Sequence, residues 1–239
     1  MIKSICMNTE GFSILSAPHI TVLVIIAIAS IVAALIYRKL SVAMQDAVGL
    51  CLGIIIAVTD ISHYIIYYFL GELSVFAIPL HLCAMAVYVC LLHSIIRADW
   101  MGQVLYALCL PGVWCALIFP DWTRFPFFSY QSLDSFIIHG LISAYITAQL
   151  ISGRITPRLK AIWKPVVFLG ITAPIAAIAN RFLGTNFMFI SRASQGSPLE
   201  WLASLTGESH ALYLILYGLL VLIVMTLLYL PFEIRRFKD

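Results

Sequence analysis

Charged residues are scarce in this chain, and their scarcity excludes an ordinary soluble fold. Only 10% of the 239 residues are Asp, Glu, Lys or Arg, while 62% are hydrophobic. A soluble domain carries about 25% charged residues. The net charge of +3 is small and the basic residues form no continuous stripe, so nucleic acid is not an expected partner. We expect one domain, residues 1–239, embedded in a membrane.

The sequence also lacks the paired Cys and His spacing of zinc sites, so it predicts no metal site and no cofactor. Five of the six cysteines fall within apolar segments, and only Cys6 lies in a segment expected outside the cytoplasm. No structural disulfide is predicted. A buried cysteine usually behaves as a small hydrophobic residue.

Long apolar runs are abundant, and a membrane-spanning helix needs about 20 such residues because lipid leaves no other partner for the backbone. The first run is followed by Arg38 and Lys39 without a small-residue cleavage site, so we interpret it as a helix and not a signal peptide. The pattern predicts an all-α membrane protein with seven transmembrane helices, over residues 20–36, 48–70, 75–96, 103–119, 133–151, 165–183 and 211–230.

The distribution of basic residues predicts the orientation, because Lys and Arg accumulate in cytoplasmic loops. One set of expected connections holds ten of the 14 basic residues. The opposite set holds four: Lys3, Arg124, Arg181 and Arg192. We therefore expect the N-terminus outside, the C-terminus in the cytoplasm, and a location in the cell inner membrane.

Polar residues in the spans gather toward the predicted outer side. Asp60 lies near the middle of the second span, where an ionised carboxylate must face protein or water. Helical spacing puts it on the same face as His63, so the carboxylate either orients that imidazole or joins a packing cluster. The histidines placed on the outer side are His19, His63, His81, His139 and His210, with His93 as the exception. Each of them alone is as easily a hydrogen-bonded structural residue.

The third span carries the most specific signal, Ile-Pro-Leu-His-Leu-Cys at residues 78–83. Pro79 predicts a kink in this helix. His81 and Cys83 would point about 200° apart on a regular helix, so we expect the partner of Cys83 to come from another span. His139 lies at matching depth. A neighbouring histidine can take the proton of a thiol and yield a nucleophilic thiolate.

The two largest outer connections have different patterns. Within residues 184–209, Ser197 and Glu200 have the spacing of a capping box, which predicts a short helix. The apolar face of this helix is expected to be an interfacial anchor or a lid. The connection 121–132 is rich in aromatic residues, including Trp122, and is interpreted as an interfacial belt.

Together the run 79–83, the histidine that opens the first span, the His139 span and the Gly-Thr-Asn-Phe-Met segment at 184–188 resemble the YwaF family of bacterial integral membrane proteins. The resemblance covers nearly the whole chain. Vertebrate relatives of that family, of the transmembrane-protein-164 kind, are acyltransferases that build ether-linked phospholipids with a cysteine in the equivalent run. The resemblance implies that Cys83 is the acyl-accepting nucleophile and His139 a base. Phe187 stands where tyrosine is more often expected.

Two functions remain as alternatives. In the first, the protein is a lipid acyltransferase or related lipid-modifying enzyme acting on membrane phospholipids. Its catalytic residues would be Cys83, His139 and His81, with Asp60, His63 and Asn186 binding or orienting substrate. In the second, it is a non-enzymatic carrier or ligand-binding protein that uses Asp60 and the outer histidines. The inner halves of the spans are mostly apolar, which favours a one-sided site over a continuous path.

Overall fold

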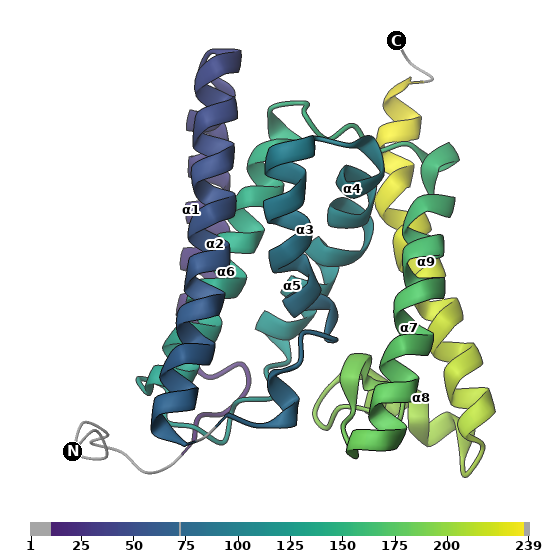
Figure 1. Ribbon diagram of the computed structural model, residues 1–239. Helices are drawn as coiled ribbons and strands as arrows, with labels where there is room; N and C mark the ends of the chain where they lie inside the picture. The colour runs from purple at the N-terminus through teal and green to yellow at the C-terminus, as the bar shows by residue number, and fades with distance from the viewer. Residues whose placement is uncertain (1–10, 72, 237–239) are drawn as a thin grey trace.

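The computed structural model describes residues 11–71 and 73–236, and within these ranges the chain is helical and contains no strand (Figure 1). Six helical stretches are long and apolar enough to cross a membrane. They are α1 (Ala17–Arg38), α2 (Val42–Leu70), the stretch Asp99–Ile118, α6 (Tyr130–Ile151), α7 (Trp163–Leu183) and α9 (His210–Arg236). The expectation of an all-α membrane protein is confirmed.

The seventh apolar helix, α3 (Leu82–Ile96), has only 15 residues. At 1.5 Å per residue it is about 22 Å long, which is shorter than the roughly 30 Å apolar thickness of a bilayer. Successive apolar helices run in opposite directions through the bundle (Figure 1). The count of seven complete spans stays a prediction.

Helix α3 is short because the segment before it is not helical, and the predicted kink at Pro79 is therefore wrong. Val75–Ala77 form a single 3-10 turn, η2. Ile78 is extended (φ −62°, ψ 127°), which is the conformation that a following proline favours. His81 is also extended (φ −75°, ψ 147°) and is the N-cap residue of α3. Proline thus delays the start of the helix.

The stretch Asp99–Ile118 is made of α4 (Asp99–Val104), a π-helical turn, η3 (Leu105–Cys109), and α5 (Leu110–Ile118). Pro111 has no N–H to donate, and its ring crowds the preceding turn; a wider turn before it relieves both problems. Such turns are frequent at functional sites. Every residue of the π turn is buried.

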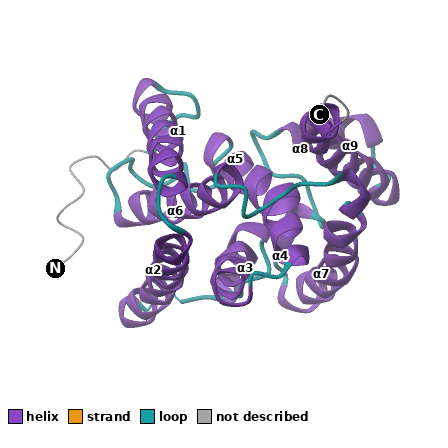
Figure 2. Ribbon diagram, turned by 90° about the horizontal axis from the view of Figure 1, so that it is seen from above, coloured by secondary structure: helices purple, strands orange, loops and turns teal. Residues whose placement is uncertain are grey.

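The helices form three groups, which Figure 2 shows from above. Helices α1, α2 and α6 lie on one side, α7, α8 and α9 on the other, and α3, α4 and α5 lie between them. The middle group includes the most buried of the candidate spans, Asp99–Ile118. The fold therefore encloses most of Asp99–Ile118 and one face of α3 in protein, which allows polar side chains there to avoid lipid.

Ion pairs collect at one end of the bundle. Asp46 pairs with Arg97 at 2.9 Å and with Arg154 at 2.5 Å. Asp99 pairs with Arg158 at 2.6 Å. These contacts bring together the helix ends next to three of the connections predicted to be cytoplasmic, at the upper end in Figure 1. The side of the membrane that this end faces stays a prediction.

The short helix predicted in the last connection is confirmed as α8 (Pro198–Thr206). The Ser197 hydroxyl accepts a hydrogen bond from the N–H of Leu199 at 3.3 Å, and Gly207 ends the helix with φ 55°. Leu199 and Leu202 are buried against α9, whereas Trp201 is 66% exposed. Helix α8 therefore lies with one face on the bundle, at the end opposite to the ion pairs (Figure 1).

Candidate functional site

A cavity of about 620 Å³ has Pro198 and Leu199 of α8 in its wall and therefore lies toward the end of the bundle that carries α8. Its wall is mostly apolar and includes residues of α2, α3, η3, α5, α6, α8 and α9, of the segments before α3 and α8, and of the loop before α6. Five of the six predicted site residues line it: Cys83, His139, His81, Asp60 and His63. Asn186 does not appear in this wall.

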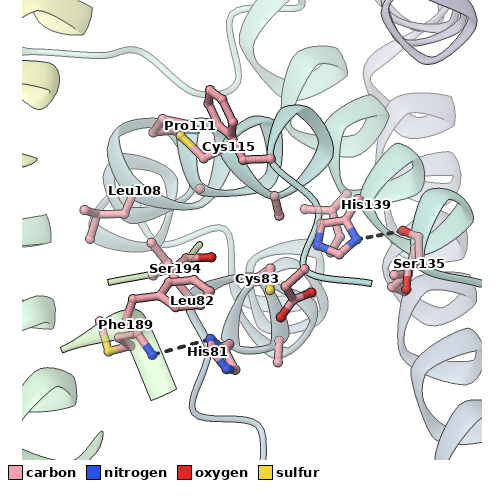
Figure 3. Close-up of a pocket in the computed structure, with 18 of the residues that line it drawn as sticks. His81, Leu82, Cys83, Leu108, Pro111, Cys115, Ser135, His139, Phe189 and Ser194 are labelled. Atoms are coloured by element: carbon pink, nitrogen blue, oxygen red, sulfur yellow. Dashed lines mark hydrogen bonds between the residues drawn. The ribbon is translucent and has the colours of Figure 1, made fainter. Parts of the chain in front are cut away.

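Cys83 occupies the first turn of α3 and is partly exposed to the cavity. His81 lines the same cavity (Figure 3). The separation of about 200° expected on a regular helix does not apply here, because His81 is extended and precedes the first turn of α3. Cys115 of α5 also lines the cavity, whereas Cys90 is completely buried.

His139, on α6, has one ring nitrogen that is bonded and one that is not. Its Nδ1 lies 2.7 Å from the carbonyl oxygen of Ser135. A carbonyl only accepts, so Nδ1 carries the hydrogen and Nε2 of the neutral ring carries a lone pair. Nε2 is buried without a hydrogen-bond partner among the described residues. In Figure 3 it lies on the side of the ring away from Ser135. Leaving such an atom unsatisfied costs about 1–3 kcal/mol.

His81 has the opposite arrangement. The backbone N–H of Met188 donates to its Nδ1 at 3.4 Å, so the neutral ring carries its hydrogen on Nε2. The rings of Phe187 and Phe189 pack against the imidazole at centroid distances of 5.4 and 5.2 Å. The cavity thus contains one imidazole arranged as a base, His139, and one arranged as a hydrogen-bond donor, His81.

The segment that contacts His81, residues 184–197, is called the strap here. Its Met188 and Phe189 have φ values of 56° and 54°, in the left-handed region that non-glycine residues seldom adopt. Side chains from both neighbouring helices hold this backbone. Asn180 of α7 donates to the Phe187 carbonyl at 3.1 Å and accepts from its N–H at 2.6 Å. The hydroxyl of Tyr213 on α9 donates to the Phe189 carbonyl at 2.8 Å.

Asn186 belongs to the strap and forms hydrogen bonds with the backbone of the strap itself. Its Oδ1 accepts hydrogen bonds from the N–H groups of Ser191 and Arg192, both at 3.1 Å. The local reason for an asparagine here is therefore loop geometry. A contact between Asn186 and substrate stays a prediction.

Of the two alternatives given for Asp60, the one in which its carboxylate bonds and orients His63 is wrong. His63 Nδ1 donates to Oδ2 of Asp134 at 2.6 Å, and its ring stacks on Tyr67 at 4.2 Å. Asp60 accepts a longer hydrogen bond, 3.3 Å, from the hydroxyl of Tyr88. Asp134 lines the cavity together with Asp60 and His63. Sequence reasoning missed Asp134 because it lies at the start of the expected span 133–151, where an acidic residue is ordinary and favourable.

Asp121 and Trp122, in the loop before α6, were also missed. Asp121 lines the cavity and lies close enough to Cys83, His81 and His139 to interact with them electrostatically. Trp122 is only 8% exposed, and its ring lies 5.3 Å from that of His139. The interpretation of this aromatic loop as an interfacial belt is therefore wrong for Trp122. A carboxylate next to a tryptophan at a span boundary was the available signal.

The other three histidines are bonded to protein and are structural. His19 Nε2 donates to the carbonyl of Leu117 at 2.8 Å, and its Nδ1 accepts a backbone N–H. His93 bonds the hydroxyl of Tyr145 at 2.9 Å. His210 donates to a carbonyl of the strap at 2.8 Å. Of the five histidines expected on the outer side, His19 and His210 bond backbone carbonyls at helix ends. The other three line the cavity.

The family comparison agrees with the relation to transmembrane-protein-164-type proteins that residues 79–83 suggested. The TMEM164 family model matches residues 14–229, which include all of the cavity residues named above. No curated protein and no solved structure matches the chain. The narrower resemblance to bacterial YwaF proteins stays a prediction. The chain belongs to the TMEM164 family.

Proposed function

We propose that this protein is a lipid acyltransferase, or a related lipid-modifying enzyme, with Cys83 as nucleophile and His139 as base. One observation carries the proposal: a buried imidazole nitrogen with a free lone pair belongs to the wall of the cavity that Cys83 also lines. A thiol and a histidine base are the two parts that cysteine acyl transfer needs. The apolar wall suits acyl chains, and the volume is typical of ligand sites.

In the first half-reaction the Cys83 thiol gives its proton to Nε2 of His139. The thiolate attacks the carbonyl carbon of a phospholipid ester, a C–S bond forms, and the C=O π electrons move to oxygen. Collapse of this intermediate breaks the ester C–O bond and leaves a thioester on Cys83. The departing alkoxide takes the proton from His139.

The second half-reaction returns the acyl group to a lipid. A hydroxyl of an acceptor lysolipid gives its proton to His139 and attacks the thioester carbonyl, and the sulfur leaves and is reprotonated. During both halves a positive imidazolium forms on His139. The carboxylate of Asp121, which interacts with that ring, stabilises this charge.

Acyl labelling tests the proposal. Purified protein incubated with a phospholipid that carries a labelled acyl chain should acquire a hydroxylamine-sensitive label, which Cys83→Ser should lose. Cys115→Ser is the matched control because Cys115 lines the same cavity, and Cys90→Ser is a buried control. His139→Ala should slow labelling about a hundredfold or more, as expected for a lost proton-transfer group.

The outcome also separates the two classes of function. Absence of any acyl adduct, together with undiminished function in Cys83→Ser, would overturn the covalent mechanism. The protein would then be a non-enzymatic carrier or ligand-binding protein, in which Asp60 and the cavity histidines bind the ligand and Cys83 only packs.

A further inference from the structure

Trp122 has an unusual environment for a buried tryptophan. Its indole Nε1 has no hydrogen-bond partner among the described residues, although the side chain is only 8% exposed. The indole N–H is a donor only, and a buried one usually finds an acceptor. Trp122 is part of the cavity wall, so the missing acceptor is expected to come from a ligand.

The indole is fixed in place. It packs edge-on against Phe136 at 5.8 Å and in a tilted arrangement against His139 at 5.3 Å, and both of these residues lie on α6. The loop that carries it is tied down on its other side, where the N–H of Phe12 donates to the carbonyl of Thr123 at 2.9 Å. The donor is therefore held in one position without a partner.

Two unpaired atoms of opposite kind thus occur on neighbouring rings. Nε1 of Trp122 can only donate, and Nε2 of His139 accepts when the ring is neutral. The two rings are tilted by 31° relative to each other, and neither nitrogen has a hydrogen-bond partner among the described residues, so they do not bond each other. The acyl-transfer reaction supplies both missing partners: the acyl carbonyl oxygen accepts from Trp122, and the Cys83 thiol or the lipid hydroxyl donates to His139.

We propose that Trp122 is a catalytic residue whose indole N–H donates a hydrogen bond to the acyl carbonyl oxygen as Cys83 attacks. This inference rests on the proposed acyl transfer. Negative charge builds on that oxygen in the tetrahedral intermediate, so a fixed donor in a water-poor cavity binds the transition state more strongly than the ground state. The carbonyl π electrons end on this oxygen and return when the ester or thioester C–O or C–S bond breaks.

Trp122→Phe removes the N–H and keeps a packed aromatic ring. Thioester formation should slow by about a hundredfold to a thousandfold, the usual effect of losing one oxyanion donor. The matched control is Trp114→Phe on α5, a partly buried tryptophan outside the cavity wall, which should retain the parental rate.

Two inhibitors separate a catalytic role from a structural one. A lipid trifluoromethyl ketone forms a hemithioketal oxyanion with Cys83, and its affinity should fall in Trp122→Phe by about the same factor as the rate. An alkyl ether lipid of equal length has no carbonyl, and its affinity should be unchanged. Equal losses for both ligands would overturn the proposal and identify Trp122 as a packing residue.

A second measurement needs no variant at position 122. The other four tryptophans are replaced by Phe, namely Trp100, Trp114, Trp163 and Trp201, and the remaining indole N–H is followed by NMR. The ketone should shift this proton strongly downfield, whereas an unchanged signal would overturn the proposal. Absence of a Cys83 adduct in the parent would instead refute the acyl-transfer function itself, and a parent-like rate in Trp122→Phe would refute only the role of Trp122.

Discussion

Replacing Asn180 by Ala should release the strap and destabilise the protein. The Asn180 side chain accepts from the N–H of Phe187 at 2.6 Å and from the hydroxyl of Thr185 at 2.9 Å, and it donates to the Phe187 carbonyl at 3.1 Å. Phe187 is completely buried, so water cannot replace these partners without a rearrangement. The neighbouring Met188 N–H holds His81, so a loose strap also disorders the cavity.

The size of the effect follows from the bonds that are lost. Each net hydrogen bond contributes about 0.5–1.5 kcal/mol, with a higher cost where a buried group is left unsatisfied. Three bonds therefore correspond to a loss of about 3 kcal/mol in the free energy of unfolding. For a chain of this size about 2–4 °C of Tm is lost per kcal/mol, so Tm should fall by about 6–12 °C.

Thermal unfolding of purified protein in detergent, followed by tryptophan fluorescence, measures the shift. Asn186→Ala is the control, because Asn186 also bonds strap backbone but does so within the loop. It should lower Tm by less than half as much. If Asn180→Ala unfolds within 2 °C of the parent, or no earlier than Asn186→Ala, the strap is not held by Asn180 and the reasoning is wrong.

Two further predictions concern the acidic residues and the topology. Asp134→Asn should destabilise the protein by about 1–2 kcal/mol more than Asp60→Asn in the same thermal assay. The reason is that the hydrogen bond from His63 to Asp134 is 2.6 Å long, whereas the bond that Asp60 accepts from Tyr88 is 3.3 Å long. Equal effects would contradict this ranking. Single-cysteine variants in residues 152–164 should be unreactive toward an impermeant thiol reagent in intact cells, and variants in residues 121–132 should react; the reverse pattern would invert the predicted orientation.

The helices could be predicted from sequence because lipid permits few alternatives to them. The span expected at 133–151 is Tyr130–Ile151, and the span expected at 165–183 is Trp163–Leu183. The third span was predicted poorly because Pro79 is compatible with two outcomes, a kink within a helix or a delayed start. Composition does not distinguish these outcomes. The packing of His81 against the strap, whose Met188 lies 107 residues later in the chain, accompanies the delayed start.

The sequence indicated which residues lie at the depth of the cavity, but it did not indicate the directions in which their side chains point. Helical position indicated that Cys83 and His139 lie at similar depth, and both line the cavity. The rotation of each helix about its axis is set by packing, so the partner of His63 was misassigned to Asp60 when it is Asp134. Trp122 was missed because aromatic residues are ordinary at a membrane boundary, and only its burial distinguishes it.

Polar contacts at the other end of the bundle favour a one-sided site over a carrier. There the hydroxyl of Tyr37 donates to the Gln45 carbonyl at 2.7 Å and accepts from Gln149 at 2.9 Å, while Arg154 donates to the Gln45 side chain at 2.8 Å. The space among these groups is about 10 Å³, roughly the minimum for one water molecule. A carrier needs polar groups that exchange partners along a continuous path. Passage here would require these mutually satisfied bonds to break, whereas the cavity around Cys83 already contains unpaired groups and space for a ligand.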